Sequence, residues 1–286
     1  MCNGSIMDKL ISFSLPLMVS GILQLAFNAV DIIVVGRFSG SQALAAVGST
    51  TALINVFTNL FIGISLGANV LAARFYAAGK DREMSETVHT SITLALISGI
   101  MMAVIGVLLA KWALEIMGTP DDVIGQSALY MRIYFMGMPF FMLYNYGAAI
   151  LRAIGDTKRP LIFLIISGIA NAALNMILVI LFHMGVAGVA IGTIISQLIS
   201  CVLVLTCLYR SEGSYQLRFS KLKINGAYME QIFQVGVPAG IQSTVINLSN
   251  ALLQSSVNSF GSIAMAGYTA ANNILGFLYM SVNSIT

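Results

Sequence analysis

Residues 12–36 read SFSLPLMVSGILQLAFNAVDIIVVG, an apolar run whose one charged side chain is Asp31. A helix rises about 1.5 Å per residue, so roughly 20 such residues cross the hydrocarbon core of a bilayer, which is about 30 Å thick. The run is also too long for the apolar region of a secretory signal peptide, which covers about 7–15 residues. We therefore interpret it as a retained transmembrane helix.

The whole chain has the same character. Its 286 residues are 58% hydrophobic and 9% charged, and the mean hydropathy is +0.89. An ordinary soluble domain carries roughly 25% charged residues, and disordered chains are polar and rich in charge. The composition excludes both classes, and the long apolar runs lack the alternation of a membrane β-barrel. The fold class that we predict is an all-α polytopic membrane protein.

Apolar runs separated by charged segments predict eight spans. They cover residues 12–36, 48–73, 88–110, 123–150, 160–182, 187–209 and 232–258, and the eighth begins near 266 and still runs at Thr286. Nearly all Lys and Arg residues lie in the N-terminal segment or after the second, fourth and sixth spans. The exceptions are Arg37, Lys111 and Arg132. Because short basic loops stay in the cytoplasm, we expect a cytoplasmic N-terminus.

Several function classes find no support in the residues. The net charge of +3 is too small to indicate nucleic-acid binding. Cys201 and Cys207 stand in an apolar run with no histidine beside them, so we interpret them as core residues rather than zinc ligands. No nucleophile–base pair and no metal-spaced cluster appears. We therefore expect no enzymatic activity and no organic cofactor.

Among the acidic residues, Asp31 is the one that lies well inside an apolar stretch. An ionised, unpaired carboxylate at that depth costs several kcal/mol, so the side chain should face protein or a wet cavity. Gln24 and Asn28 precede it at helical spacing and lie on the same helix face. A proton or a bound cation would neutralise the carboxylate. The residues alone therefore predict a carrier or a channel with one titratable site inside the membrane.

Other predicted spans carry polar stripes of the same kind. The stripes are Thr51, Asn55 and Asn59; Ser167, Asn171 and Asn175; Thr193, Ser196, Gln197 and Ser200; and Ser243, Asn247, Asn250 and Gln254. Hydrogen bonds between helices, worth about 0.6 kcal/mol per pair, explain most such residues without any further function. For Asp31 we favour a functional role, because a carboxylate is a poor choice for packing alone.

Two backbone features concern helix packing and bending. The pairs Gly63-x3-Gly67 and Gly188-x3-Gly192 permit helices to approach closely. Pro16 lies inside the first predicted span and leaves a backbone carbonyl without its usual donor. We predict a hinge at Pro16.

A series of short segments gives the most specific signal in the sequence. The clearest, residues 151–160, reads LRAIGDTKRP between the fourth and fifth spans. The others are Pro16, VDIIVVG at 30–36, YMRI at 130–133, Gly137-x-Pro139, Asn171-x3-Asn175 and Gly188-x4-Thr193. In this order, and over essentially the whole chain, they resemble the MATE (multidrug and toxic compound extrusion) family, in particular its bacterial NorM-like members.

The resemblance implies a fold of twelve helices in two six-helix lobes. On that basis residues 1–209 would form the N-terminal lobe with six transmembrane helices, and residues 210–231 the cytoplasmic inter-lobe loop. Residues 232–286 would then begin the C-terminal lobe with helix seven and part of helix eight, so the chain looks truncated. The full-length protein is expected to be a monomer in the bacterial cytoplasmic membrane.

The resemblance also implies a secondary-active exporter of organic cations that exchanges them for inward H⁺ or Na⁺. The family's coupling carboxylate matches Asp31, which also becomes a candidate Na⁺ ligand, and its polar partners match Asn171 and Thr193. Some relatives have a second acid where this chain has Asn175, which puts coupling through a carboxylate pair in doubt. An amide oxygen still coordinates Na⁺. The expected partners are small organic cations and the lipid bilayer, with no nucleic acid.

The resemblance implies a central cavity that faces the two sides of the membrane in turn. We expect the polar residues of the stripes to line it, namely Gln24, Asn28, Asn55, Gln197, Asn250 and Gln254. One alternative is a lipid-linked precursor flippase of the related superfamily, which would be expected to carry several cations in its cavity. A channel, the other alternative, needs a continuous polar pore.

Overall fold

The computed structural model describes residues 6–283, with side chains from residue 13 to residue 276 except Asn273. All regular structure in these residues is helical, which confirms the all-α prediction. The elements are α1 (Ile6–Phe38), α2 (Ser41–Ala77), α3 (Asp81–Ile116), α4 (Asp121–Met136), α5 (Met138–Ala153), α6 (Lys158–Met176), η1 (Ile177–Leu181), α7 (Gly185–Arg210), η2 (Phe219–Lys221), α8 (Gly226–Asn258) and α9 (Ser262–Asn283). The predicted continuation of the eighth span to Thr286 lies outside the described residues.

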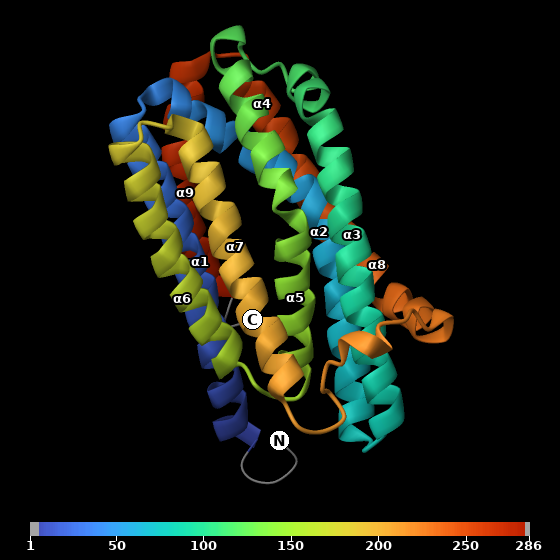
Figure 1. Ribbon diagram of the computed structural model, residues 1–286. Helices are drawn as coiled ribbons and strands as arrows, with labels where there is room; N and C mark the ends of the chain where they lie inside the picture. Colours follow the sequence, from blue (N-terminus) through green and yellow to red (C-terminus); the bar gives the residue numbers. More distant parts are fainter. Residues whose placement is uncertain (1–5, 284–286) are drawn as a thin grey trace.

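The long helices stand side by side in two groups (Figure 1). One group holds α1, α6, α7 and α9, and the other holds α2, α3, α5 and α8. Helix α5 contacts α2, α3 and α7 and so joins the groups, while α2 packs along α8. The connections at 77–81, 153–158 and 210–226 lie together at the bottom of Figure 1. We call this end the basic end, because the Lys and Arg residues of the predicted cytoplasmic loops lie in or beside these connections.

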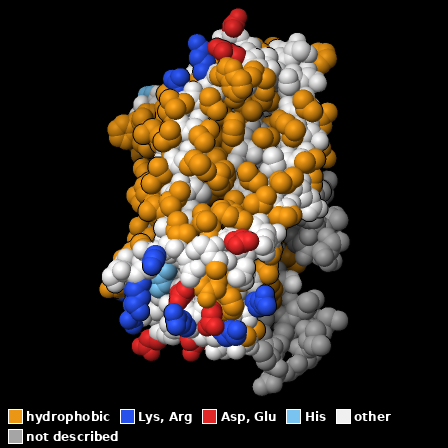
Figure 2. Space-filling model, turned by 90° about the vertical axis from the view of Figure 1, so that its right-hand side faces the viewer, with side chains coloured by type: hydrophobic (Ala, Val, Ile, Leu, Met, Phe, Trp, Pro, Cys, Tyr) orange, Lys and Arg blue, Asp and Glu red, His pale blue; other side chains and the backbone are white. Residues whose placement is uncertain are grey.

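The core is centred on α4 and α5. Phe135, Met138, Met142 and Tyr146 lie on these two helices and are fully buried. Large apolar side chains elsewhere, such as Leu108 on α3, point outward and stay exposed. Figure 2 shows them as a broad apolar belt, with most of the charged side chains gathered toward the two ends. This distribution is typical of a protein whose middle faces hydrocarbon.

Five helical stretches of the described residues are long and apolar enough to cross a membrane. They are Phe13–Phe38, Ser41–Ala77, Asp81–Ile116, Lys158–Leu181 and Gly185–Arg210. The predicted spans at 123–150 and 232–258 are missing from this set. Helix α8, which contains the second of them, is less apolar because it carries Gln242, Asn247 and Gln254, and these residues line a cavity described below.

The prediction of one helix over 123–150 is wrong, because the chain forms α4 and α5 with a break at Gly137. Pro139 has no N–H, so it cannot donate to the carbonyl of Phe135. At the break, the Gly137 N–H donates to the Tyr134 carbonyl at 3.0 Å. The backbone N–H groups of Phe140 and Phe141 both donate to the Gly137 carbonyl. Each half is 16 residues long, which is too short to cross the membrane alone.

The helix in the predicted span 160–182 also changes from α-helical to π-helical geometry before its end. Helix α6 gives way after Met176 to the π-helical turn η1. Such turns contain one more residue per hydrogen-bonded ring than an α-helix, and they often occur at functional sites. Here the turn begins two residues after Asn175, one of the predicted site residues.

Four glycines lie where α2 and α8 cross. A Cβ atom on Gly63 would lie 2.2 Å from the Cα of Gly240, and one on Gly67 would lie 2.1 Å from the carbonyl oxygen of Ile232. In the other direction, a Cβ on Gly236 would lie 2.5 Å from the Cα of Ile64. The two backbones are therefore in direct contact. The predicted pair Gly63-x3-Gly67 thus meets a second pair, Gly236-x3-Gly240, which the sequence analysis did not single out.

At the basic end, Asn225 joins the start of α8 to α3. Its Oδ1 accepts from the Ala227 N–H at 3.1 Å and caps α8, and its Nδ2 donates to Glu86 Oε2 at 2.7 Å. Its backbone N–H donates to Thr90 Oγ1 at 3.1 Å. Helix α8 consequently begins at Gly226, before the start of the predicted span at residue 232.

Replacing Asn225 by Ala is expected to lower the stability of the protein by about 1 kcal/mol, because the helix cap is lost. For a chain of this size that corresponds to a melting temperature lower by about 2–4 °C. Thermal unfolding in detergent micelles measures the effect. Asn225→Asp keeps the capping oxygen but sets a second carboxylate against Glu86, so any loss beyond that of Asn225→Ala reports the contact with Glu86. An unchanged melting temperature in Asn225→Ala would contradict the capping role.

Candidate functional site

A cavity of about 1120 Å³ lies between α1, α2, α4, α8 and α9. Amides and hydroxyls make up most of its polar lining, namely Asn28, Thr51, Asn55, Asn59, Gln242, Ser243, Asn247, Asn250, Gln254, Thr269 and Asn272. Among the described residues that line it, Asp31 is the one acid, and none is Lys, Arg or His. The cavity is therefore rich in hydrogen-bonding groups and carries at most one negative charge.

Asp31 stands at the boundary between this cavity and a buried polar cluster. Its side chain lines the cavity, yet the residue is only 8% exposed. The Nδ2 group of Asn175 on α6 donates a hydrogen bond to Asp31 Oδ1. The carboxylate is thus held in a fixed position by the protein and remains open to the cavity on its other side.

The polar cluster behind Asp31 is a chain of hydrogen bonds across two further helices. Asn175 Nδ2 also donates to Asn171 Oδ1 at 3.3 Å, and Asn171 Nδ2 lies 3.5 Å from Thr193 Oγ1 on α7. The Thr193 hydroxyl donates in turn to the Val189 carbonyl at 2.9 Å. The structure therefore brings together all four residues that were predicted to act in ion coupling, from α1, α6 and α7.

The carboxamide of Asn175 uses its nitrogen fully and leaves its oxygen free. Among the described residues, Asn175 Oδ1 is buried without a hydrogen-bond partner. It occupies the space beside Gly192, where a Cβ atom would lie only 2.3 Å away. A buried carbonyl oxygen without a partner costs roughly 1–3 kcal/mol, so it is available to bind a donor or a cation.

Tyr130 and Tyr134 complete the cavity wall near Asp31. They are four residues apart on α4, and their ring centroids lie 6.0 Å from each other. Aromatic faces attract organic cations through their quadrupole. From the sequence, Tyr130 was noted only as part of a family-like segment, and Tyr134 was not predicted. The spacing of four residues, which places both rings on one helix face, is the signal that would have found them.

The six residues predicted to line the cavity separate into two groups. Asn28, Asn55, Asn250 and Gln254 do line it. Gln24 and Gln197 are not among its described lining residues. Gln24 is exposed on α1, two turns before Asp31, although its neighbour Leu25 lines the cavity. The Oε1 atom of Gln197 is buried beside Gly137, 3.0 Å from the position of a Cβ there.

Pro16 lies buried within α1, and the helix is unbroken from Ile6 to Phe38. The hydroxyl of Ser20 donates to the Pro16 carbonyl at 2.7 Å. The hinge at this position stays a prediction, since one structure contains one conformation of the helix.

The chemistry available at the site is the binding of a cation by oxygen atoms. Within the described part of the chain, no three His, Cys, Asp or Glu side chains lie together as a metal site. A hard cation prefers carboxylate and neutral carbonyl or hydroxyl oxygens. Asp31, Asn171, Asn175 and Thr193 provide such oxygens in one cluster, and a proton on Asp31 would neutralise the same charge.

Comparison with known proteins gives one consistent result. The MatE family model matches residues 16–177. The probable multidrug resistance protein YoeA of Bacillus subtilis (strain 168) is 33% identical over 282 residues, which cover 96% of this chain and 60% of that protein. The chain therefore spans about 60% of the length of the curated relatives that it matches.

Solved structures share the fold. The MATE multidrug transporter DinF-BH, solved in complex with rhodamine 6G, superposes with a TM-score of 0.91 at 23% identity, over 98% of this chain and 63% of that chain. The inward-facing conformation of a multidrug resistance MATE family transporter of the MOP superfamily gives a TM-score of 0.81 at 21% identity, over 96% of this chain and 64% of that chain. The arrangement of helices in Figure 1 is thus that of these transporters.

Proposed function

Because the chain belongs to the MATE family of multi-pass membrane transporters, as its sequence segments predicted, we propose that it serves in secondary-active export of organic cations in exchange for Na⁺ or H⁺. The single observation that carries the proposal is the position of Asp31. This carboxylate faces a large cavity on one side and a buried cluster of amide and hydroxyl oxygens on the other.

The lining of the cavity favours a cationic cargo. Asp31 supplies the negative charge, while Tyr130 and Tyr134 supply aromatic faces beside it. A flippase for an anionic lipid-linked precursor would be expected to carry Lys or Arg at this place, and the described lining has none. An organic cation with hydrogen-bonding groups fits both the charge and the surrounding amides.

Coupling follows if the cargo and the ion compete for the same carboxylate. Ionised Asp31 holds an organic cation in the cavity. A proton or Na⁺ that reaches Asp31 through the cluster of Asn171, Asn175 and Thr193 neutralises the carboxylate. The ion drives the exchange only because it binds the two conformations with different affinity. For Na⁺, Asn175 would turn its carboxamide so that the free oxygen, now beside Gly192, faces the ion together with Asp31.

We further propose the arrangement of the chain in the membrane. Residues 1–209 form the first lobe, residues 210–231 connect the lobes, and residues 232–286 begin the second lobe of a protein that acts as a monomer when full length. The N-terminus and the basic end face the cytoplasm of a bacterium, in agreement with the positive-inside rule. The position of Lys80, Arg159 and Lys223 at or beside the same set of connections supports this orientation.

Dye exchange in vesicles tests the proposed function. The chain is reconstituted, rhodamine 6G is loaded, and an inward gradient of Na⁺ or of H⁺ is imposed separately. We expect dye movement against its own gradient with one of the two ions and none without an ion gradient. Dye movement that ignores both gradients, or ionic currents far above carrier rates, would favour the channel instead.

Replacing Gly192 by Ala should weaken ion coupling while Asp31 remains intact. The new methyl group would fall 2.3 Å from Asn175 Oδ1 and displace the carboxamide. Changes of this kind beside an ion ligand typically lower the ion affinity roughly 10- to 100-fold. The measurement is the ion concentration that gives the half-maximal rate of dye exchange, which should rise about tenfold or more. Gly267→Ala is the matched control, since a Cβ there meets nothing within 4 Å. An equal effect in both variants would contradict the role of Asn175 in ion binding.

A further inference from the structure

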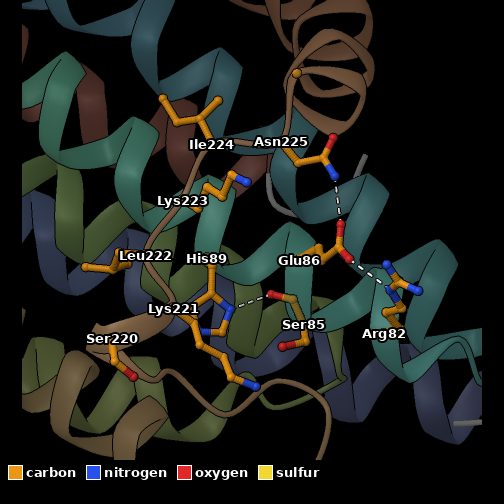
Figure 3. Close-up of a pocket in the computed structure, with 11 residues that line it drawn as sticks. Arg82, Ser85, Glu86, His89, Ser220, Lys221, Leu222, Lys223, Ile224 and Asn225 are labelled. Atoms are coloured by element: carbon orange, nitrogen blue, oxygen red, sulfur yellow. Dashed lines mark hydrogen bonds and ion pairs between the residues drawn. The ribbon is translucent and has the colours of Figure 1, made fainter.

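A second cavity, of about 1030 Å³, lies at the basic end, away from the transport site. It is formed between the first turns of α3 and the segment 220–226 that leads into α8 (Figure 3). Its lining includes the side chains of Arg82, Ser85, Ser220, Lys221 and Lys223. We call it the basal groove.

The walls of the basal groove are fixed to each other by hydrogen bonds. His89 Nε2 accepts from the backbone N–H of Arg218 at 3.1 Å, and its Nδ1 donates to the Ser85 carbonyl at 2.6 Å. His89 is only 4% exposed, so this contact is shielded from water. Together with the bonds from Asn225 to Thr90 and Glu86, it makes the groove a preformed site rather than a loose loop.

The charge that remains free in the groove is positive. Glu86 is its one carboxylate, and both oxygens are occupied, Oε1 by Arg82 at 3.1 Å and Oε2 by Asn225 at 2.7 Å. Lys221 and Lys223 are exposed, and neither lies within ion-pair distance of a described carboxylate, although the charge of Lys223 acts on Glu86 from farther away. Two lysine ammonium groups are therefore available to an anionic ligand.

We place the groove at the level of the lipid headgroups. Helix α3 is 36 residues long and spans about 54 Å, which exceeds a hydrocarbon core of about 30 Å. Its first turns carry Asp81, Arg82, Glu83 and Glu86, so we place them outside the hydrocarbon core, on the side of the headgroups. Figure 2 shows the corresponding charged zone below the apolar belt.

Exposed apolar side chains beside the lysines point to the same layer. Phe219 is 54% exposed and stacks on Tyr209 with ring centroids 5.8 Å apart, and Leu222 stands exposed between the two lysines. Tyrosine is enriched at the boundary between headgroups and hydrocarbon, and the Tyr209 side chain is itself exposed. The segment therefore has exposed apolar and basic side chains next to each other.

We propose that the basal groove binds the phosphate headgroup of an anionic phospholipid, in the leaflet that the basic end faces. Lys221 and Lys223 meet the phosphate charge, and the hydroxyls of Ser85 and Ser220 are available as donors in the same lining. Phe219 and Leu222 contact the upper part of the acyl chains. Basic pockets at the ends of transmembrane helices bind such headgroups, and each lysine near the surface contributes about a fivefold gain in affinity.

A tryptophan reporter tests this site directly. Trp112 is the single tryptophan of the chain and lies at the far end of α3, so Trp112→Phe combined with Phe219→Trp places one reporter beside the groove. The protein is reconstituted in phosphatidylcholine vesicles that contain either brominated phosphatidylglycerol or brominated phosphatidylcholine at equal mole fraction. We expect quenching to report a preference for phosphatidylglycerol of roughly 20-fold.

The preference should fall to about twofold or less in the reporter that also carries Lys221→Gln and Lys223→Gln. Both side chains are exposed, so the variant should fold, and an unchanged reporter emission spectrum in plain phosphatidylcholine checks this. Lys158→Gln is the matched control, because Lys158 is an exposed cation of the basic end outside the groove, and it should keep the full preference.

Three results would overturn the proposal. Equal quenching by the two brominated lipids would mean that the groove does not select an anionic headgroup. Loss of the preference in Lys158→Gln as well would assign it to the general positive charge of this end. Abolition of the preference by inorganic phosphate at constant ionic strength would assign the groove to a soluble phosphate compound instead of a lipid.

Discussion

Replacement of Asp31 by Asn is expected to lower ion-driven exchange of a cationic dye by about 100-fold, a loss that corresponds to the upper range of coupling free energies between two sites. Asn has nearly the same shape as Asp and keeps an oxygen that accepts the hydrogen bond from Asn175. The substitution therefore removes the charge and leaves the packing of α1 against α6 in place.

The charge is decisive because it is the only negative charge of the described cavity lining. Without it, neither the organic cation nor the coupling ion gains the electrostatic stabilisation that makes one displace the other. The measurement is the initial rate of dye movement in vesicles under an imposed Na⁺ or H⁺ gradient. Binding of the dye without a gradient should also weaken.

Asp121→Asn is the matched control for this substitution. Asp121 is an exposed carboxylate in the first turn of α4 and does not line the cavity. It should leave the exchange rate within about twofold of the parent protein, in the range of ordinary surface substitutions. Full gradient-driven exchange in Asp31→Asn would refute the coupling role of Asp31.

Gly63→Ala is expected to cause a large loss of stability for the addition of a single methyl group. The new Cβ would lie 2.2 Å from the Cα of Gly240, so a backbone rather than a flexible side chain stands in its way. Overpacking of this kind costs about 2 kcal/mol, and for a chain of this size the melting temperature should fall by roughly 4–8 °C.

A glycine elsewhere provides the control for the change in backbone freedom. Gly125 lies in α4, and a Cβ there meets nothing within 4 Å. Gly125→Ala should therefore raise the stability by about 0.5–1 kcal/mol, since alanine restricts the unfolded chain and favours the helix. Opposite shifts in the two variants, measured by thermal unfolding in detergent, would confirm the direct backbone contact. Parallel shifts would refute it.

Most helix positions and the polar cluster around Asp31 could be predicted from the sequence because both depend on local contrast. A carboxylate within an apolar run, as at Asp31, stands out against its neighbours whatever the tertiary structure. The spacing of Asn171 and Asn175 places them on one helix face without further information. The structure added the contact between these faces and brought Thr193 to the same cluster.

Other features depend on how each helix is rotated against its neighbours, which spacing alone does not determine. Gln24 shares the helix face of Asp31, yet it is exposed and is not among the described residues that line the cavity, and Gln197 is turned toward Gly137. The break between α4 and α5 was missed because apolar character continues through Pro139, although a missing N–H interrupts the helix. The partner of Gly63 and Gly67 required knowledge of which helix crosses α2.

The crossing of α2 and α8 also has an entropic consequence. Side chains that interlock at a helix interface must each give up rotamers when they meet and recover them when they part. Gly63, Gly67, Gly236 and Gly240 have no rotamers, and here the two helices meet through backbone atoms. The two helices can therefore separate and rejoin at this place without any side chain having to find its conformation again.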